Sequence, residues 1–219
     1  MLRSAQALAT VTREQLVDER KRLFGDAETP VAVCVIRLLA SRRFDLVIDA
    51  VAQLAKQGRR VNLLLVGEGP AKQALAEQAM KLGVNLHFYG PCYDENVLAR
   101  LTAMANVTVC PGPVGLTAIQ SMAFGTPVIS NDDYDTQMPE FETIITGKTG
   151  DLFRAGDVAS LAETLERWTR TTWTDDSTRL ACQRIIDEVW NAKVQRCVID
   201  RAVDGKPADD LWRSREGCP

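Results

Sequence analysis

The segment CPGPVGLTAIQ places Gly112, Pro113 and Gly115 directly before a predicted helix. Small residues there would let the backbone N–H groups of Val114, Gly115 and Leu116 approach an anion at the helix N-terminus, where partial positive charge gathers. The alternative is a tight strand-to-helix turn that needs glycine for its geometry alone. The pattern therefore indicates either an anion-binding loop or a plain turn.

A second group of candidate residues lies in the segment RLLASRR, which contains Arg37, Arg42 and Arg43. The planar guanidinium group binds two oxygens at once, which suits a diphosphate. A solvated surface cluster is the alternative interpretation of the same three residues.

The segment VGEGP holds Gly67 and Gly69, a G-x-G pair at the end of another apolar run. The dinucleotide-binding fingerprint requires a third glycine, and Lys72 stands at that position. The fingerprint also belongs to the first strand of such a fold, whereas this pair follows the second predicted strand. The sequence therefore argues against an NAD-binding site.

Two further features carry little chemical signal. Asp133 and Asp135 form a D-x-D pair that could hold a divalent metal, but a solvated loop is the favoured interpretation of so short a motif. His87 lies in an apolar run without a partner at the spacing of a catalytic triad, and a structural role is favoured. We predict no metal site.

The elements that must position these residues alternate between β-branched runs and helical periodicity. Such alternation predicts an α/β protein with a Rossmann-like, doubly wound parallel sheet of about six strands, whose ligands bind beyond the carboxyl ends of the strands. A helix capped by Thr12 precedes the first strand, and C-terminal helices follow the last at 177–190 and 192–203. The predicted strands are 31–36, 61–67, 84–90, 107–112, 126–130 and 150–153.

The composition of the 219-residue chain excludes several classes of protein. With 46% hydrophobic and 25% charged residues the chain can bury a core, and a net charge of −3 does not suit nucleic acid or anionic membrane as partners. No apolar run approaches the roughly 20 residues of a membrane span. Six cysteines without a C-x-x-C pair predict reduced thiols and a cytoplasmic location.

Taken together, the turns resemble the C-terminal half of family-4 glycosyltransferases, which are retaining enzymes of the two-domain GT-B type. The resemblance covers about residues 31–203. It is most similar to a bacterial branch of polysaccharide glycosyltransferases with a P-G-x-V-G-L-T-A-I motif. The matching stretches are IRLLASRRFDLVIDAVAQL, VNLLLVGEGP, LHFYGPCYDENVLARL, VTVCPGPVGLTAIQSMAFGTPVISND and QMPEFETIITGKTGDLF.

The resemblance implies roles for individual residues. Arg37 and Arg42 match the family's catalytic cations, which contact the donor diphosphate and stabilise the leaving nucleotide. Since these cations and a helix N-terminus hold the diphosphate, the resemblance implies no metal and no other cofactor. The implied donor-binding residues are Gly90 and Pro91 beside the base, together with Gly112, Val114, Gly115, Leu116, Thr117 and Gln120.

This chain departs from the family pattern at four positions. Gly112 and Gln120 stand where the family has two glutamates that contact the donor sugar and the ribose. Gln120 can still form a hydrogen bond with a ribose, whereas Gly112 contributes no side chain. Ile36 and Phe141 replace a glycine and a proline of the family motifs.

The resemblance also implies a domain organisation. We expect a leading linker segment with a helix (1–29), a nucleotide-sugar-binding domain (30–174), helices that return toward a second domain (175–203) and a polar tail (204–219). We expect the family's N-terminal, acceptor-binding half, which carries its histidine, to be absent from this chain. The chain is then either a fragment or a separate gene product that pairs with such a half, and we expect no transfer by the isolated chain.

The leading hypothesis is the donor-binding half of a glycosyltransferase of cell-surface polysaccharide synthesis. It would act in the cytoplasm, with a partner bringing it to the inner membrane. The alternatives are a non-catalytic nucleotide-sugar-binding or partner-binding module, and an unrelated doubly wound phosphotransferase or epimerase.

Trp190, Val194 and Val198 recur at near-helical spacing. This stripe either binds a second copy or an N-terminal half, with Trp190 as anchor, or packs against the chain's own domain.

Overall fold

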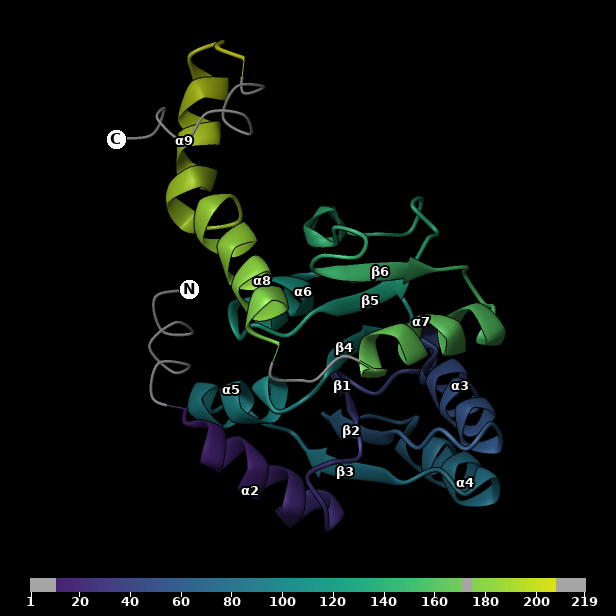
Figure 1. Ribbon diagram of the computed structural model, residues 1–219. Helices are drawn as coiled ribbons and strands as arrows, with labels where there is room; N and C mark the ends of the chain where they lie inside the picture. Colours follow the sequence, from purple (N-terminus) through teal and green to yellow (C-terminus); the bar gives the residue numbers. More distant parts are fainter. Residues whose placement is uncertain (1–10, 171–174, 208–219) are drawn as a thin grey trace.

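The computed structural model describes residues 11–170 and 175–207. Within them a six-stranded sheet has the order β3-β2-β1-β4-β5-β6, and every neighbouring pair of strands is parallel (Figure 1). The predicted Rossmann-like α/β fold is confirmed. The strands are β1 (Val31–Val35), β2 (Asn62–Val66), β3 (Leu86–Gly90), β4 (Val107–Cys110), β5 (Val128–Asn131) and β6 (Gly150–Phe153).

Helices cover both faces of the sheet. One face carries α3 (Phe44–Lys56), α4 (Lys72–Leu82) and α7 (Val158–Arg170). The other carries α2 (Arg13–Phe24), α5 (Glu95–Ala103), α6 (Leu116–Ala123) and α8 (Asp176–Glu188). Two short 3-10 helices, η1 (Ala40–Arg42) and η2 (Pro139–Thr143), lie in the loops after β1 and β5.

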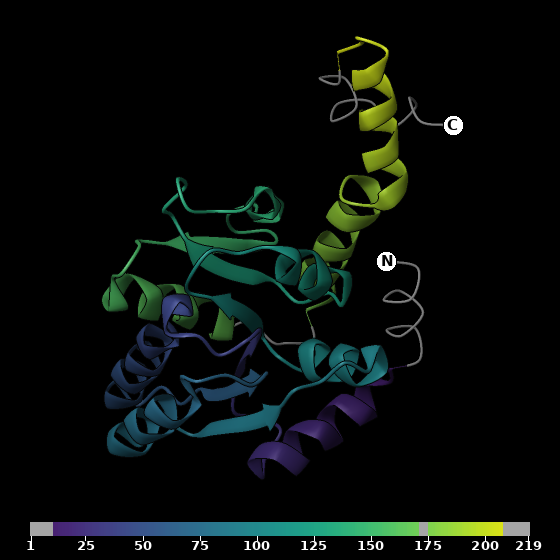
Figure 2. The same ribbon diagram turned by 180° about the vertical axis from the view of Figure 1, so that it is seen from behind.

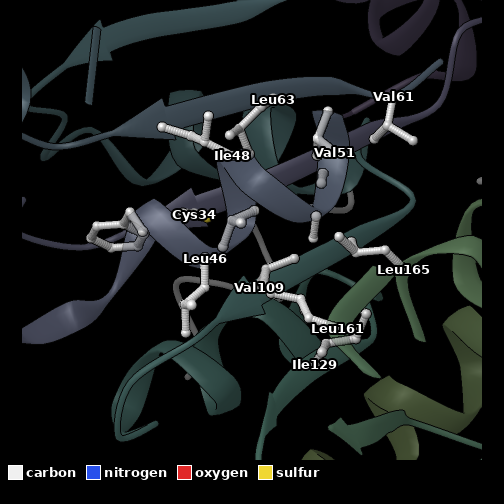
Figure 3. Close-up of a cluster of buried hydrophobic side chains, with 14 of the residues drawn as sticks. Cys34, Leu46, Ile48, Val51, Val61, Leu63, Val109, Ile129, Leu161 and Leu165 are labelled. Carbon is white, nitrogen blue, oxygen red and sulfur yellow. The ribbon is translucent and has the colours of Figure 1, made fainter. Parts of the chain in front are cut away.

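This double coverage explains why the strands are continuous apolar runs. Successive side chains of a strand point to opposite faces. Along β1, Ala32 and Cys34 therefore join the cluster under α3 and α7, while Val31 and Val33 join the cluster under α2 and α5. Figure 3 shows part of the first cluster, with Cys34 and Val109 of the sheet beside side chains from α3 and α7.

The strand ends differ slightly from the prediction. β4 ends at Cys110 rather than at residue 112, since Pro111 has no N–H group to donate to a neighbouring strand. The predicted sixth strand at 150–153 is confirmed.

Helix α2 belongs to the folded unit. The sequence predicted a segment outside the core, but Leu16 and Arg20 are buried. The Arg20 guanidinium donates to the Met104 carbonyl (2.7 Å), the Ala27 carbonyl (2.9 Å) and the Asn106 side-chain oxygen (2.7 Å). A buried arginine therefore fastens α2 to the end of α5 and the start of β4.

At the C-terminal end, α8 packs on α6, and α9 (Ala192–Val203) extends away from the sheet in both views (Figures 1 and 2). Trp190 is buried in the cluster that contains Met122 of α6 and Ile186 of α8. The expectation of an exposed Trp190 anchor is therefore wrong, and its alternative, burial against the chain's own helices, is correct. Val194 and Val198 are half-buried.

The thiols also differ in part from expectation. Cys34, Cys92, Cys110 and Cys182 are free, whereas Cys197 is disulfide-bonded, so the prediction of six reduced thiols is wrong at Cys197. Over residues 11–170 and 175–207, no helix is both long enough and apolar enough to cross a lipid bilayer.

Candidate functional site

An open pocket of about 490 Å³ lies at the carboxyl ends of β1, β2 and β3. This is the edge at which ligands bind in doubly wound folds. The pocket is lined by the ends of these strands and the loops after them: Val35, Ile36 and Arg37 after β1, Val66, Gly67, Glu68 and Gly69 after β2, and Pro91, Cys92 and Tyr93 after β3. Of the predicted site residues, Arg37 and Pro91 line it directly, and Gly90 ends the strand beneath Pro91.

The G-x-G pair after β2 brings two backbones into contact. The Leu38 N–H donates to the Glu68 carbonyl (3.0 Å), and the Ala71 N–H donates to the Leu38 carbonyl (3.1 Å). A Cβ atom on Gly69 would overlap the Leu38 carbonyl, and one on Gly67 would overlap the Ile36 carbonyl. These glycines therefore allow the loops after β1 and β2 to meet and form the pocket wall.

The glycine-rich turn after β4 is held by two side chains from the neighbouring strand β5. Ser130 donates to the carbonyls of Cys110 (3.1 Å) and Gly112 (3.4 Å). Asn131 donates to the Pro111 carbonyl (3.0 Å). Both donors are buried at the end of β5. The turn contains two prolines and cannot extend the sheet, so these side chains supply the missing partners.

Two further hydrogen bonds complete this hold on the turn. Arg42 donates from Nη1 to the Pro113 carbonyl (2.7 Å). The Val114 N–H donates to Oε1 of Gln137 (2.8 Å). The expectation that the Val114 amide faces an anion is therefore wrong, because a side chain from the loop after β5 already accepts its proton.

Helix α6 begins directly after this turn. Gly115 is its N-cap, and within the described part of the chain no side chain caps it. The first N–H groups of the helix, those of Leu116 and Thr117, are therefore left for water or a ligand. The Thr117 hydroxyl lies 3.3 Å from the Val35 carbonyl and donates to it. Since Val35 also lines the pocket, the start of α6 and the pocket are adjacent.

The three predicted arginines have different surroundings. Arg37 is exposed and lines the pocket. Arg42 is half-buried and bonded to the glycine-rich turn. Arg43 instead pairs with Asp45 over 3.0 Å, which raises the pKa of its guanidinium. The structure thus brings Arg37 and Arg42 to the site and turns Arg43 toward its own helix.

No thiol near the site is activated as a nucleophile among the described residues. Burial raises the pKa of the Cys110 thiol to about 12, and the Arg42 charge offsets only part of this effect. Partial burial also raises the pKa of the Cys92 thiol. The nucleophile in thiol chemistry is the thiolate, which neither residue supplies at neutral pH.

The remaining candidates of the sequence have structural or solvated surroundings. His87 packs edge-on against Phe24, and burial, aided by the Arg22 charge, lowers the pKa of its imidazole. Asp133 and Asp135 are exposed in the loop after β5. Among residues 11–170 and 175–207, no group of three or more His, Cys, Asp or Glu side chains could hold a metal ion.

Sequence reasoning missed several residues of the site. Glu68 and Tyr93 line the pocket, and Tyr93 is 91% exposed. Ser130, Asn131 and Gln137 hold the glycine-rich turn. The polar pair Ser-Asn at the end of an apolar strand was the available signal, since buried polar side chains there need partners. Gln120, which was predicted, lies on α6 and is half-buried.

A family model described as "Glycosyl transferases group 1" matches residues 18–182. A GDP-mannose-dependent alpha-(1-6)-phosphatidylinositol dimannoside mannosyltransferase of Mycobacterium tuberculosis is 36% identical over 107 residues, which are 46% of this chain and 28% of the relative. The lipopolysaccharide core biosynthesis glycosyltransferase LpsE of Rhizobium meliloti is 27% identical over 160 residues, which are 72% of this chain and 45% of the relative.

Solved structures share the fold. Anabaena Alr3699/HepE in complex with UDP-glucose superposes with a TM-score of 0.73 at 21% identity, over 90% of this chain and 54% of that one. A glycosyltransferase from Rickettsia africae ESF-5 gives a TM-score of 0.74 at 15% identity, over 93% of this chain and 56% of that one. The chain therefore spans less than half of these two curated relatives and little more than half of these two structures.

Proposed function

The chain belongs to the glycosyl transferases group 1 family, and from that premise we propose that it supplies the half that binds the nucleotide-sugar donor in synthesis of a cell-surface polysaccharide or glycolipid. One observation carries the proposal: a pocket lined by Arg37 adjoins the start of α6 through the Thr117–Val35 hydrogen bond. A nucleoside and its diphosphate need such a neighbouring pair of sites.

We assign the nucleoside to the pocket at the ends of β1, β2 and β3. Pro91 and Tyr93 offer apolar surface on which a base can stack, and Glu68 offers a carboxylate to ribose hydroxyls or base N–H groups. The diphosphate then lies toward Arg37, Arg42 and the first N–H groups of α6, with Gln120 as a further polar contact.

In transfer, the bond between the anomeric carbon and the diphosphate oxygen breaks, and negative charge grows on the departing diphosphate. Fixed cations and helix N–H groups stabilise that charge more in the transition state than in the ground state. We propose that Arg37 and Arg42 do this without a metal and with retention of configuration. The acceptor would come from a second, N-terminal half, in the cytoplasm at the inner membrane.

The proposal is tested by titrating the chain with UDP-glucose and GDP-mannose in the calorimeter, with EDTA and then with Mg²⁺. We expect one donor to bind equally well in both buffers. Arg37→Ala should weaken binding about tenfold, which corresponds to about 1.4 kcal/mol. Arg59→Ala is the matched control, since Arg59 precedes β2 and pairs with Glu166. If neither donor binds, the proposal fails; binding only with Mg²⁺ would overturn the metal-free part and restore Asp133 and Asp135 as ligands.

Gly112 favours a second candidate function, a module that binds a nucleotide-sugar or a partner without transfer. A Cβ atom at Gly112 would lie 3.2 Å from the Arg42 Cα, so this position has little room for the acidic side chain expected from the family pattern. Such a module would bind the donor yet give no product when mixed with an acceptor substrate and a candidate N-terminal half. Product formation in that mixture favours the transferase.

A further inference from the structure

Gln137 connects the loops after β4 and β5 through a single side-chain amide. Its Oε1 accepts from the Val114 N–H (2.8 Å). Its Nε2 donates to the Asn131 carbonyl (2.8 Å), to the Asn131 side-chain oxygen (3.2 Å) and to Ser130 Oγ (3.1 Å). The Val114 N–H group can only donate and the Asn131 carbonyl can only accept. The Gln137 amide satisfies both groups in this orientation alone, with Oε1 toward Val114 and Nε2 toward Asn131.

Gln137 holds the backbone immediately before helix α6. Val114 directly precedes Gly115, the N-cap of α6. The Val114 N–H belongs to the peptide unit between Pro113 and Val114, whose carbonyl accepts from Arg42, so Gln137 and Arg42 hold one peptide unit from its two sides. The orientation of this unit fixes where the following residue, Gly115, and with it α6, begins. Val114 is itself buried, so this unit cannot turn without disturbing the packing under it.

We propose that Gln137 is a positioning residue that fixes the diphosphate-binding turn in the orientation needed to bind the donor's phosphates. The inference rests on the proposed function, and it assigns to Gln137 no contact with the ligand. A misplacement of about 1 Å in a positioning group can cost as much as a hundredfold in activity. Loss of a residue that holds the turn should therefore lower the affinity for phosphates by more than the strength of its own hydrogen bonds suggests.

The anchoring side of the bridge supports this role. Ser130 and Asn131 end β5, are buried and also donate to Cys110 and Pro111 of the turn. Gln137 therefore attaches the far end of the turn to the same rigid strand that holds its near end. Arg42 holds the Pro113 carbonyl in the same way. The backbone of every residue from 110 to 114 therefore has a hydrogen-bond partner in a side chain from a neighbouring strand or loop.

The position of the Gln137 bridge distinguishes an effect on phosphate binding from an effect on the whole site. None of Val114, Ser130 and Asn131 lines the pocket assigned to the nucleoside. Loss of the Gln137 bridge should therefore weaken the binding of phosphates and leave the binding of a nucleoside unchanged. A purely stabilising role would instead lower the melting temperature without discriminating between the two ligands.

Gln137→Glu is the sharpest variant. Its size is nearly unchanged and it still accepts from Val114, but an ionised carboxylate cannot donate to the Asn131 carbonyl and is repelled by it. When protonated, the new carboxyl group can donate again. Gln137→Leu removes both functions at every pH. Thr136→Val is the matched control, because the Thr136 hydroxyl donates within its own loop, to the Asp133 carbonyl (3.1 Å).

The experiment is an NMR titration of the folded chain with UDP and GDP, and with uridine and guanosine, at pH 8 and pH 5.5. At pH 8 we expect Gln137→Glu and Gln137→Leu to bind the preferred diphosphate at least tenfold more weakly than wild type, with nucleoside affinity within twofold. The two Asn131 oxygens that face this position disfavour an ionised carboxylate and should raise the pKa of the new carboxyl group above its ordinary value of about 4.3. At pH 5.5 the Gln137→Glu variant should therefore regain part of its affinity relative to wild type measured at the same pH, whereas Gln137→Leu should not.

The inference is overturned if both variants bind the diphosphate as wild type does, or if diphosphate and nucleoside affinities fall together. It is also overturned if Thr136→Val reproduces the loss. Failure of the proposed function is seen separately, since wild type itself would then bind neither UDP nor GDP, and the role of Gln137 would fall with it.

Discussion

The Arg42 guanidinium donates a hydrogen bond from Nη1 to the Pro113 carbonyl over 2.7 Å, and so joins the loop after β1 to the glycine-rich turn after β4. An arginine carries five N–H donors in a fixed fork. One bond to Pro113 leaves the other donors for a ligand on the same edge of the sheet. Arg42 can therefore shape the site and bind in it.

We predict that Arg42→Lys weakens nucleoside diphosphate binding about tenfold, although the charge is kept. A lysine ammonium is a point charge and cannot hold the Pro113 carbonyl and two phosphate oxygens in one plane. Arg43→Lys, which alters a neighbouring arginine paired with Asp45, should bind as wild type. Calorimetric titration with UDP and GDP measures both variants, and equal affinities in the two would contradict the assigned role of Arg42.

The close contact of the loops after β1 and β2 gives a prediction about stability. In Gly69→Ala the new methyl group meets the Leu38 backbone carbonyl, which cannot turn aside as a side chain could. We expect a loss of about 2–4 kcal/mol in the free energy of unfolding, typical of a forced backbone shift.

Gly58→Ala is the control for Gly69→Ala. Gly58 has a φ of +78°, and a methyl group added there would meet nothing within 4 Å, so this variant tests backbone strain without a clash. We expect it to cost about 1 kcal/mol. Urea denaturation of both variants decides: equal losses would show that the approach of Gly69 to Leu38 is not tight.

Arg20 gives a third prediction, about the attachment of α2. Burial lowers the pKa of its guanidinium to about 10, so the group is still charged at neutral pH and depends on its hydrogen bonds. In Arg20→Met the carbonyls of Met104 and Ala27 lose this donor. We expect a loss of about 3 kcal/mol in unfolding free energy, since each buried acceptor left unpaired costs about 1–3 kcal/mol. An unchanged urea midpoint would contradict this account.

The fold could be predicted from the sequence because its signal is local. β-Branched runs such as 31–35 and helices with caps such as Thr12 and Asp94 are set by neighbouring residues. The glycines of the turns were also visible. The role of these glycines was not visible. That of Gly69 depends on its contact with the backbone of Leu38, which only folding brings near.

The site was predictable only in part for the same reason. Val114 has the residue type and place of an anion-binding amide, but its partner Gln137 lies 23 residues further on in a polar loop without a motif. Trp190 has the spacing of an interface anchor, and periodicity does not say which surface a helix presents. Its burial beside Met122 depends on how α8 packs on α6.

Asp175 gives a prediction about pH. It caps α8, accepting from the Ser177 N–H (3.0 Å) and hydroxyl (2.7 Å). These bonds, the hydroxyl first, hold the pKa of the Asp175 carboxyl below its ordinary value of 3.8. A carboxyl whose pKa is lower in the folded state stabilises the protein above its unfolded-state pKa, and this contribution is lost as the pH falls through the folded-state value.

We therefore compare wild type with Asp175→Asn, which keeps a good helix cap but has no carboxyl group to titrate. Wild type should be more stable by about 0.3–1 kcal/mol from pH 7 to pH 5, the range for a charge at a helix N-terminus. Below pH 4 the difference should shrink, because protonation removes the charge from wild type alone. Urea denaturation at pH 7, 5, 4 and 3.5 measures it. A difference that stays constant over this series would mean that the Asp175 charge does not stabilise α8.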